Sequence, residues 1–323
     1  MGGRDLCLGI DVGGTKVSAA LFTESGEISH REKAPLNTTG ADEAADQIAA
    51  LIAEYEEAGH APRAIGIAIP GVVFHESGAV WAPNVPGWDR YPLLDRLRSA
   101  TGAEVILDSD RAAYVLGEQW CGAARGAENV VFLAVGTGIG AGILVDGRVC
   151  RGADDIAGAV GWFALTPEFR AEYADRGCFE CEASGPAVAE RAIELLGSQS
   201  SNVIAELVDH DLGRVTAEIV VEAAHQDDPM AREVLDHAVN YLAMGIANIV
   251  SILNPEIVVL GGGLLQAGEL LLDPITREFK QWAQPLAAEQ VRLELSALGE
   301  DAGLFGAGRL AWNAVSTPRG DAT

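Results

Sequence analysis

Two short glycine-containing stretches, Asp11-Val-Gly-Gly-Thr-Lys16 and Gly136-Thr-Gly-Ile-Gly140, carry residue types suited to binding a polyphosphate. Each follows an apolar run typical of a strand and leads back into apolar sequence, which predicts a hairpin. Glycine lets the backbone approach a ligand closely, successive unpaired amides favour anions, and a threonine hydroxyl adds a donor. Because the stretches lie about 125 residues apart, we predict two opposed phosphate loops, formed by Gly13, Gly14 and Thr15 and by Gly136, Thr137 and Gly138.

Asp11 stands at the end of the first predicted strand, directly before its glycine turn. A carboxylate does not bind phosphate itself, but it holds Mg²⁺ or the waters of Mg²⁺, and the cation then bridges to phosphate oxygens. The alternative is that Asp11 only starts the turn. Lys16 is either a phosphate contact or a solvated lysine on the returning strand.

Asp110 lies between a predicted strand over 104–107 and a helix of small residues that reaches Glu118. A carboxylate at the end of a strand, above a cleft, is placed to accept a proton from a hydroxyl. Two other interpretations compete. Asp110 caps the helix, or Asp108-Ser109-Asp110 is a phosphatase-type nucleophile pair, although Ala112 occupies the position where Thr or Val is expected.

Three further glycine-rich or aromatic segments suit a sugar or a nucleoside. Asn84-Val-Pro-Gly-Trp88 follows Pro70-Gly71, and the Asn84 amide suits a vicinal diol, while Trp88 either stacks on a sugar or seals the core. Gly261-Gly-Gly263 ends a buried strand, where a ribose or base can lie against bare backbone. Alternate glycines from Gly136 to Gly142 share one strand face, which either a ligand or another backbone must approach.

The elements that position these residues follow one plan twice. Strands over about 6–12, 17–22 and near Ile28, a helix over 41–58, a strand over 64–69, a helix over 93–100 and a strand over 104–107 give the order β-β-β-α-β-α-β. A second β-turn-β begins near 129, and a helix over about 228–253 precedes the strand 257–260. We interpret this as internal duplication. Residues 164–184 and 198–212 are expected to be insertions, 302–315 a helix, and the tail from 317 disordered.

Composition limits the class of partner. The 323 residues carry a formal charge of −25, which opposes binding to nucleic acid or to anionic membranes, although solubility alone also explains it. The chain starts without the apolar segment of a signal peptide and has no run long enough to cross a membrane. Five scattered cysteines then favour reduced thiols in a cytoplasm.

Together these motifs resemble the ROK family of sugar kinases, within the actin/hexokinase-like ATPase superfamily, over nearly the whole chain. The two glycine hairpins resemble the two phosphate motifs of the family. The family's Asn-Asp pair falls on Ser109-Asp110, which gives Asp110 the position of the catalytic base. Other matching segments are Gly66-Ile-Ala-Ile-Pro-Gly71 and Asn84–Trp88 for the sugar, and Leu260-Gly-Gly-Gly263 and Gly303-Leu-Phe-Gly-Ala-Gly308 for adenosine.

The resemblance implies an α/β, two-lobed actin/hexokinase-like (ribonuclease H-like) fold with duplicated β-β-β-α-β-α-β lobes and an interlobe cleft. Residues 1–118 plus 301–323 are expected to form the N-terminal lobe, and 119–300 the C-terminal lobe. The cofactors implied are ATP and Mg²⁺, with Asp11 holding the cation through water. The implied reaction is glucokinase-like transfer of a phosphoryl group to a hydroxyl of a hexose or hexose-like substrate, by a cytoplasmic homodimer.

The sugar side departs from the family pattern. The usual Ala-Gly-Glu-x-Gly-His, whose Glu binds sugar and whose His binds sugar and zinc, is Ala157-Gly-Ala-Val-Gly-Trp162 here. The Cys-x-Cys-Gly zinc segment is missing as well, and because Cys178 and Cys181 are two thiols without further ligands, we expect no zinc. The sugar-binding residues that the resemblance leaves are Gly71, Asn84, Ser109, Asp110, Trp162 and Glu180, and the nucleotide-binding residues are Asp11, Gly13, Gly14, Thr15, Lys16, Gly136, Thr137, Gly138, Gly261, Gly262 and Gly263.

This combination favours changed specificity over lost activity, because the nucleotide side is intact. A less hydroxylated or N-substituted sugar, or a cyclitol, fits the altered sugar side, and plain glucose remains a candidate. The alternative from another class is a non-catalytic sugar-binding protein. A repressor of the family would need a helix-turn-helix, for which the start of the chain leaves no room, and polyphosphate as donor would need a basic groove.

Overall fold

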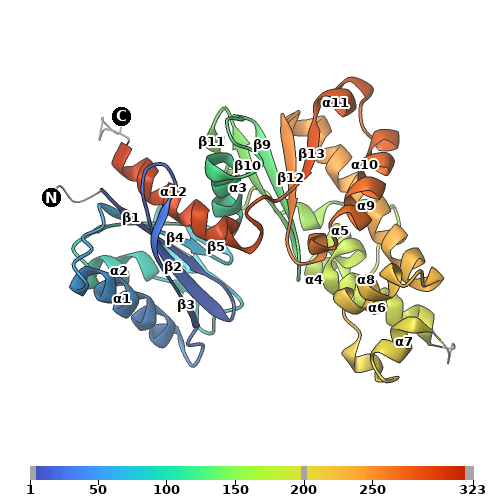
Figure 1. Cartoon of the computed structure of the whole chain (residues 1–323), viewed down its shortest axis with the longest axis horizontal. Coiled ribbons are helices and arrows are strands. Elements are labelled where there is room, and N and C mark those ends of the chain that lie inside the picture. The colour runs from blue at the N-terminus through green and yellow to red at the C-terminus, as the bar shows by residue number, and fades with distance from the viewer. Residues whose placement is uncertain (1–4, 198–201, 317–323) are drawn as a thin grey trace.

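Two five-stranded sheets with the same strand order form the body of the molecule (Figure 1). The computed structural model describes residues 5–197 and 202–316, so the tail predicted to be disordered lies outside the described residues. The first sheet has the order β3-β2-β1-β4-β8, and the second has the order β11-β10-β9-β12-β13. These strands are β1 Cys7–Val12, β2 Lys16–Phe22, β3 Ile28–Pro35, β4 Ala64–Ile69, β8 Glu104–Ser109, β9 Val130–Val135, β10 Ile139–Val145, β11 Arg148–Val149, β12 Ile257–Gly261 and β13 Arg292–Leu295.

The strand directions repeat as well as the order. In the first sheet, β2 is antiparallel to both β1 and β3, while β4 runs parallel to β1 and β8. In the second sheet, β10 is antiparallel to β9 and β11, while β12 runs parallel to β9 and β13. The predicted duplication is therefore confirmed. We call the part around the first sheet the first lobe and the part around the second sheet the second lobe.

Helices fill the connections that parallel strands require. They are α1 Ala41–Glu57, α2 Leu93–Ala100, α3 Asp110–Cys121, α4 Tyr173–Arg176, α5 Cys178–Ala183, α6 Gly185–Leu196, α7 Val203–Leu207, α8 Ala217–His225, α9 Pro229–Leu253, α10 Glu269–Trp282, α11 Pro285–Gln290 and α12 Ala302–Ser316. Short 3₁₀ turns are η1 Val160–Trp162, η2 Leu212–Arg214, η3 Leu264–Ala267 and η4 Gly299–Asp301.

Two insertions decorate this duplicated plan. In the first lobe a three-stranded sheet follows β4, formed by β5 Val72–Phe74, β6 Ala79–Trp81 and β7 Asp89–Tyr91. In the second lobe the region between β11 and α9 contains the helices α4 to α8. The segments 164–184 and 198–212, predicted to be insertions without periodicity, fall in this region, and their described residues form short helical turns.

The long helix α9 shows how local chemistry sets element bounds. The Asp228 carboxylate caps its start by accepting the Ala231 N–H at 2.8 Å, and Pro229 occupies the first turn. Asn254 ends the helix with a φ of 43°, and Pro255 follows. The predicted helix over 228–253 therefore has the correct bounds to within one residue.

The last helix, α12, returns to the first lobe and packs on β1, β4 and α3. In Figure 1 it lies beside the strands β1 and β4, although about 230 residues separate it from β4. Contact is backbone to backbone, since a methyl group on Gly66 would lie 2.0 Å from the Ala307 carbonyl oxygen, and one on Gly306 would lie 1.8 Å from that of Ala113. The α3–α12 pair also covers Val130 and Phe132 of the second sheet, so it joins the two lobes.

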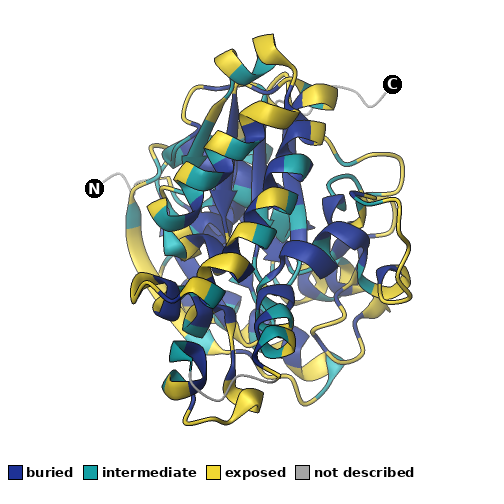
Figure 2. Ribbon diagram, turned by 90° about the vertical axis from the view of Figure 1, so that its right-hand side faces the viewer, coloured by how far each residue is buried: buried dark blue, intermediate teal, exposed yellow. Residues whose placement is uncertain are grey.

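Buried residues concentrate in the strands, and the outer helices expose their solvent faces (Figure 2). One face of the first sheet packs on α1 and α2, and one face of the second sheet packs on α9 and α10. Within the part of the chain that the structure describes, no helix has the length and hydropathy of a membrane span.

Candidate functional site

Two carboxylates with shifted pKa values mark the site. Asp11 is the next-to-last residue of β1, and Asp110 begins α3, directly after β8. Burial raises the pKa of Asp11 to about 7, and the charge of Asp110 adds to this shift. Burial also raises the pKa of Asp110 to about 6, although the Arg111 charge and backbone hydrogen bonds oppose the shift. Paired carboxylates with raised pKa values are typical of sites that hold cations or move protons.

The structure contradicts the two competing interpretations of Asp110, as a helix cap and as part of a phosphatase-type pair. Ser109 is the residue that caps α3, because its hydroxyl accepts the Ala112 N–H at 3.2 Å. Asp110 accepts the Arg111 N–H at 2.8 Å through Oδ1, and the Tyr114 hydroxyl lies 3.4 Å from Oδ2. Asp108 accepts hydrogen bonds from Arg151 and is buried. The cap hypothesis was therefore wrong for Asp110, and Asp108 is not free to act as a phosphatase nucleophile.

The first glycine hairpin connects β1 to β2 and lies against the predicted sugar loop. Its turn is closed by the Gly13 N–H, which donates to the Lys16 carbonyl at 2.8 Å. A methyl group on Gly14 would lie 3.4 Å from Cβ of Asn84, and one on Gly303 would lie 2.8 Å from Oδ1 of Asp11. The Lys16 ammonium pairs with Glu300 at 3.0 Å, and both side chains are largely exposed. The pair holds Lys16 at the protein surface, so its role as a phosphate contact stays a prediction.

The second glycine hairpin connects β9 to β10 and is fixed by Glu180. The Gly136 N–H donates to the Gly138 carbonyl at 2.9 Å, and Glu180 Oε2 accepts the Ile139 N–H at 2.9 Å. Burial raises the pKa of Glu180, although this hydrogen bond opposes the shift. A methyl group on Gly161 would lie 3.2 Å from the same Oε2 atom. Glu180 thus brings the hairpin together with the segment that carries Trp162, whose side chain is 56% exposed.

A pocket of about 410 Å³ opens beside the second hairpin. Its lining includes Gly136 and Thr137 of the hairpin, Gly263 and Leu264 after β12, and Thr216 before α8. The volume falls in the range of small-molecule sites. The structure therefore places Gly136, Thr137 and the predicted adenosine segment around one cavity. Gly262 supports this bend with a φ of 98°, a value that favours glycine.

Arg111 joins the Asp110 side of the site to the second hairpin. A methyl group on Gly142 would lie 1.9 Å from the Arg111 carbonyl oxygen, and one on Gly140 would lie 2.9 Å from its Cδ. The group that approaches Gly142 is thus the Arg111 backbone, and the group that approaches Gly140 is the Arg111 side chain, so neither glycine faces a ligand. The facing of the two hairpins across one triphosphate stays a prediction.

Two other predicted sugar residues have structural roles. Trp88 is 1% exposed and donates its indole N–H to the Ala41 carbonyl at 3.0 Å, so it seals the core rather than stacking on a ligand. Gly71 has a φ of 154°, and a methyl group there would lie 2.1 Å from the Trp81 carbonyl oxygen. Glycine is therefore required at 71 by packing, whether or not a sugar lies nearby.

The segment where the family pattern places zinc is held by other contacts. The Cys178 sulfur accepts the Leu165 N–H at 3.4 Å, and the Cys181 thiol donates to the Glu172 carbonyl at 3.6 Å. The buried Glu182 carboxylate accepts hydrogen bonds from Arg170 and Tyr173 and contacts His237 at 2.8 Å. These side chains tie α5, which carries Glu180, to α4 and α9.

Sequence reasoning missed several residues of the site. Tyr114 lies four residues after Asp110 on α3, and this helical spacing was the signal that could have found it. Thr216 and its neighbours reach the pocket from the region between β11 and α9, which shows no clear periodicity before α8. Arg111 contacts the second hairpin through packing that only the fold reveals, and Gly303, predicted to lie on the adenosine side, packs against Asp11.

Removing the Asp11 charge should stabilise the ligand-free protein at high pH but not at low pH. The carboxyl of Asp11 keeps its proton up to about pH 7 in the fold, whereas its ordinary pKa is 3.8. Between these values the unfolded chain binds fewer protons than the folded one, so the Asp11 contribution to stability falls as pH rises. The difference between 3.8 and about 7 corresponds to about 4 kcal/mol when it is fully expressed. Because Asp11 is only partly buried, solvent screens part of this. We therefore expect Asp11→Asn to gain about 2 kcal/mol at pH 8 and almost nothing at pH 4.

Urea unfolding of both proteins at the two pH values measures this gain. The control is Asp273→Asn, since Asp273 is exposed on α10. An equal gain at both pH values would show that Asp11 does not titrate as described.

The duplicated lobes, the glycine hairpins and the paired carboxylates define a two-lobed phosphotransferase of the actin/hexokinase-like class. The profile of the ROK family matches residues 7–314. The sequence is 35% identical over 314 residues to a glucokinase of Halalkalibacterium halodurans, covering 94% of each chain. It is 35% identical over 303 residues to a glucokinase of Thermotoga maritima, covering 93% of this chain and 95% of that protein.

The fold matches the crystal structure of a ROK family glucokinase from Streptomyces griseus in complex with glucose and AMPPNP. The TM-score is 0.80 at 31% sequence identity, and the match covers 95% of this chain and 99% of the other. The chain belongs to the ROK family, and it is a sugar kinase of that family.

Proposed function

We propose that this kinase transfers the γ-phosphoryl group of ATP to a hydroxyl of a hexose-like sugar, with Asp110 as the base. The observation that carries this proposal is the partly buried carboxylate of Asp110, whose charge acts on Asp11 and which begins α3 directly after β8. A base with a raised pKa near 6 is ionised at neutral pH and still accepts a proton from a hydroxyl in the transition state.

The glycine hairpins are proposed to hold the triphosphate. The amides of Gly13, Gly14, Gly136 and Gly138 would donate to phosphate oxygens, together with the hydroxyls of Thr15 and Thr137. The pocket of about 410 Å³ between the second hairpin and Gly263 fits an adenosine group. This assignment also uses the match to a structure that was solved with AMPPNP.

A magnesium ion fits the carboxylate pair. The charge of Asp110 raises the pKa of Asp11, so a nearby cation would relieve their repulsion. Among residues 5–197 and 202–316, no group of three or more His, Cys, Asp or Glu side chains is arranged to hold a metal directly. We therefore propose that Asp11 holds Mg²⁺ through its waters. When bound, Mg²⁺ supplies positive charge that neutralises the phosphate oxygens.

The sugar is proposed to lie between Asn84 and Asp110 of the first lobe and Glu180 and Trp162 of the second. Ala159 and Trp162 stand where the family pattern has a glutamate and a histidine. Loss of two polar partners disfavours a fully hydroxylated sugar by about 1.5–3 kcal/mol for each lost charged hydrogen bond. An N-substituted or less hydroxylated hexose, or a cyclitol, therefore fits the site, and glucose stays within the tested set.

Truncation of Trp162 should weaken sugar binding with little effect on the chemical step. Its exposed indole offers a flat surface for a sugar face. We expect Trp162→Ala to raise the KM for sugar about tenfold and to leave kcat within about twofold, since a stacking contact contributes about 1 kcal/mol or more. Steady-state kinetics at saturating ATP measure both constants.

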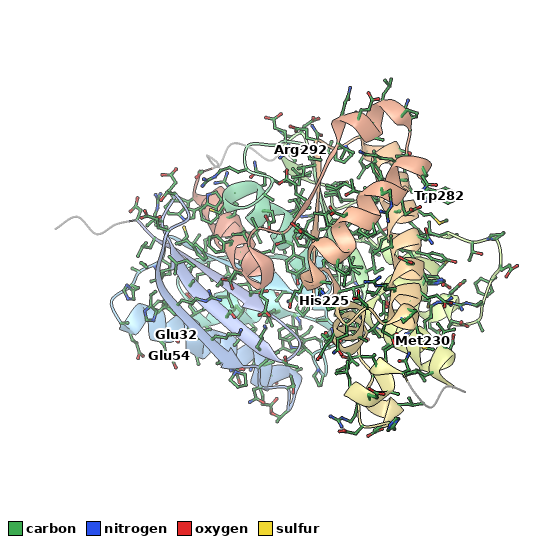
Figure 3. The ribbon with its side chains drawn as sticks, turned by 45° about the vertical axis from the view of Figure 1, so that its right-hand side comes forward. Glu32, Glu54, His225, Met230, Trp282 and Arg292 are labelled. Atoms are coloured by element: carbon green, nitrogen blue, oxygen red, sulfur yellow. The ribbon has the colours of Figure 1, made fainter. Side chains whose placement is uncertain are left out.

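The matched control is Trp282→Ala. Trp282 is 58% exposed on α10, at the right-hand side of Figure 3. An equal rise of the KM for sugar in both variants, or an unchanged KM in Trp162→Ala, would exclude Trp162 from the sugar site.

A coupled ADP-release screen over hexoses, N-acetylhexosamines and cyclitols tests the function itself. A kinase gives sugar-dependent ADP release with at least one member of the set. A non-catalytic sugar-binding protein would show sugar binding by calorimetry without ADP release. We further propose a cytoplasmic homodimer, to be tested by light scattering and cell fractionation, and lobes bounded at 1–118 plus 301–323 and at 119–300.

A further inference from the structure

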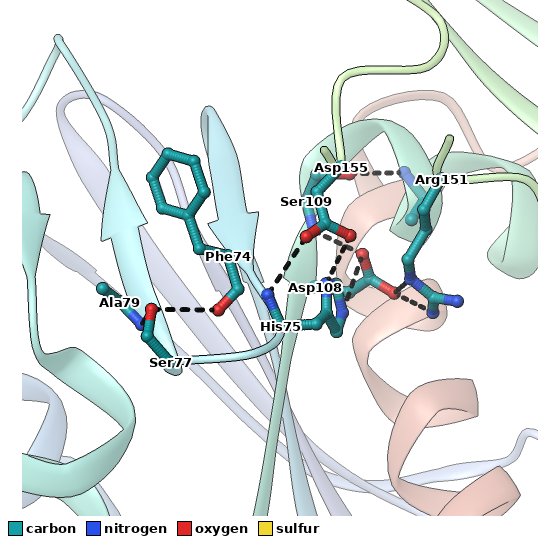
Figure 4. A network of polar contacts seen from close by, with 9 residues as sticks. Phe74, His75, Ser77, Ala79, Asp108, Ser109, Arg151 and Asp155 are labelled. Atoms are coloured by element: carbon teal, nitrogen blue, oxygen red, sulfur yellow. Dashed lines mark hydrogen bonds and ion pairs between the residues drawn. The ribbon is translucent and has the colours of Figure 1, made fainter. Parts of the chain in front are cut away.

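Four polar side chains, a histidine, an arginine and two aspartates, form a contact between the lobes that the phosphate and sugar sites do not use. His75 follows β5 and Asp108 lies near the end of β8, both in the first lobe, while Arg151 and Asp155 belong to the loop after β11 in the second lobe. Figure 4 shows Arg151 pointing toward Asp108 and Asp155 pointing toward His75. We call His75, Asp108, Arg151 and Asp155 the cross-lobe latch.

Asp108 is the buried centre of the latch. Its side chain is 3% exposed, and a buried carboxylate without partners would be strongly unfavourable. Oδ2 accepts hydrogen bonds from two guanidinium nitrogens of Arg151, with Nε at 3.2 Å, and Oδ1 accepts the Ser109 N–H at 2.8 Å. The guanidinium of Arg151, in the second lobe, therefore supplies hydrogen bonds that the buried Asp108 carboxylate of the first lobe needs.

A second connection runs beside the first. Asp155 accepts the backbone N–H of His75 at 3.1 Å through Oδ2. Its Oδ1 lies 2.8 Å from Nδ1 of the His75 ring. The other ring nitrogen, Nε2, lies 3.9 Å from Asp108. Asp155 has a φ of 59°, which few residues other than glycine adopt without support from their surroundings. Two side chains of each lobe thus hold one another.

The cavity within the latch is too small for a substrate. Its volume is about 10 Å³, with a lining that includes His75, Asp108 and Arg151. Such a volume holds about one water molecule. The cluster is therefore a contact between lobes rather than a subsite for sugar.

The latch connects two segments of the proposed active site. Asp108 is two residues before Asp110, and it is bonded to the amide that leads into the helix of that base. On the other side, the Ala157 N–H donates to the Arg151 carbonyl at 2.9 Å, and the Ala141 N–H donates to the Gly158 carbonyl at 2.8 Å. The loop that carries Arg151 is therefore fixed to β10 and continues directly into the turn of Trp162.

We propose that Asp108 and Arg151 are positioning residues that set the orientation of the lobes, and thereby the distance between the Asp110 base and the groups of the second lobe. The proposal rests on the proposed kinase function. Neither residue touches the reacting atoms. Their role is to place the base of one lobe opposite the phosphate hairpin of the other, and a misplacement of about 1 Å is enough to cost about a hundredfold in rate.

The test combines kinetics with a measurement that needs no activity. In Arg151→Gln and Asp108→Asn, we expect kcat for sugar phosphorylation to fall between about tenfold and a hundredfold. The KM for ATP should stay within about twofold, because the pocket beside the second hairpin is unchanged. The double variant should be no slower than the slower single variant, since both remove one contact. Small-angle scattering of the ligand-free proteins should show a larger radius of gyration in all three variants.

Controls separate positioning from folding and from the function itself. Arg148→Gln removes an exposed arginine of the same hairpin and should match the wild type. Arg151→Lys, which keeps the charge, should recover part of kcat. The latch would be overturned by additive losses of kcat in the double variant, or by an Arg151→Gln protein with the same kcat and radius of gyration as Arg148→Gln. Losses of kcat that follow the melting temperatures of the variants would also overturn it. If the wild type phosphorylates no sugar, the proposed function fails, and scattering alone still decides whether the latch holds the lobes.

Discussion

Replacement of the proposed base, Asp110→Asn, should lower kcat for sugar-dependent ADP release by about 10³-fold at pH 8. An amide has almost the shape of the carboxylate but does not accept a proton, and general-base catalysis contributes about 10²–10⁴-fold. The same variant should unfold at a higher temperature than the wild type at pH 8, because burial disfavours the ionised carboxylate that the wild type holds there. Lost activity with raised stability distinguishes a catalytic role from damage to the fold.

The control for this experiment is again Asp273→Asn on α10, which should match the wild type in both measurements. Turnover of Asp110→Asn within about tenfold of the wild type would refute the assignment of the base. A fall in its melting temperature at pH 8 would show instead that Asp110 has a structural role.

Replacement of Gly306 by valine should destabilise the protein by roughly 4 kcal/mol, the largest stability change that we expect. A Cβ atom at 306 would lie 1.8 Å from the Ala113 carbonyl oxygen, and that neighbour is helix backbone which cannot rotate away. Gly306→Ala should lose about 2 kcal/mol, although alanine raises helix propensity by about 1 kcal/mol. Urea unfolding of the wild type and both variants measures the change.

Gly102→Val provides the matched control. A methyl group at 102 meets no atom within 4 Å, so the added side chain should change stability by less than about 0.5 kcal/mol. Equal stability of Gly306→Val and the wild type would mean that α3 and α12 are not in backbone contact.

The duplicated architecture could be predicted from the sequence because its signals are local. Apolar strands that run into glycine turns, and a helix bounded by Asp228 and Pro255, depend on near neighbours in the chain. The position of Asp110 between a strand and a helix could be predicted for the same reason, while its role as the base stays a prediction. The two glycine hairpins also lie where they were predicted.

The remaining parts of the site depend on contacts between distant segments. Nothing near Asp108 in the sequence indicates that Arg151 completes its partners, and the cap role fell to Ser109 because helix geometry placed its hydroxyl on the Ala112 amide. Trp88 and Gly71 have sequence neighbours that suit a sugar loop, but the packing of Ala41 and Trp81 decides their roles. Such contacts between distant segments leave no periodic signal.

The return of α12 to the first lobe has a consequence for synthesis. The strands β1 and β4 leave the ribosome long before the helix that covers one of their faces, because about 230 residues lie between β4 and α12. Domains at the N-terminus commonly fold during translation. This nascent chain departs from that order, because the apolar face formed by Cys7, Ala20 and Ala64 gains its cover of Leu304 and Trp312 only near the end of elongation.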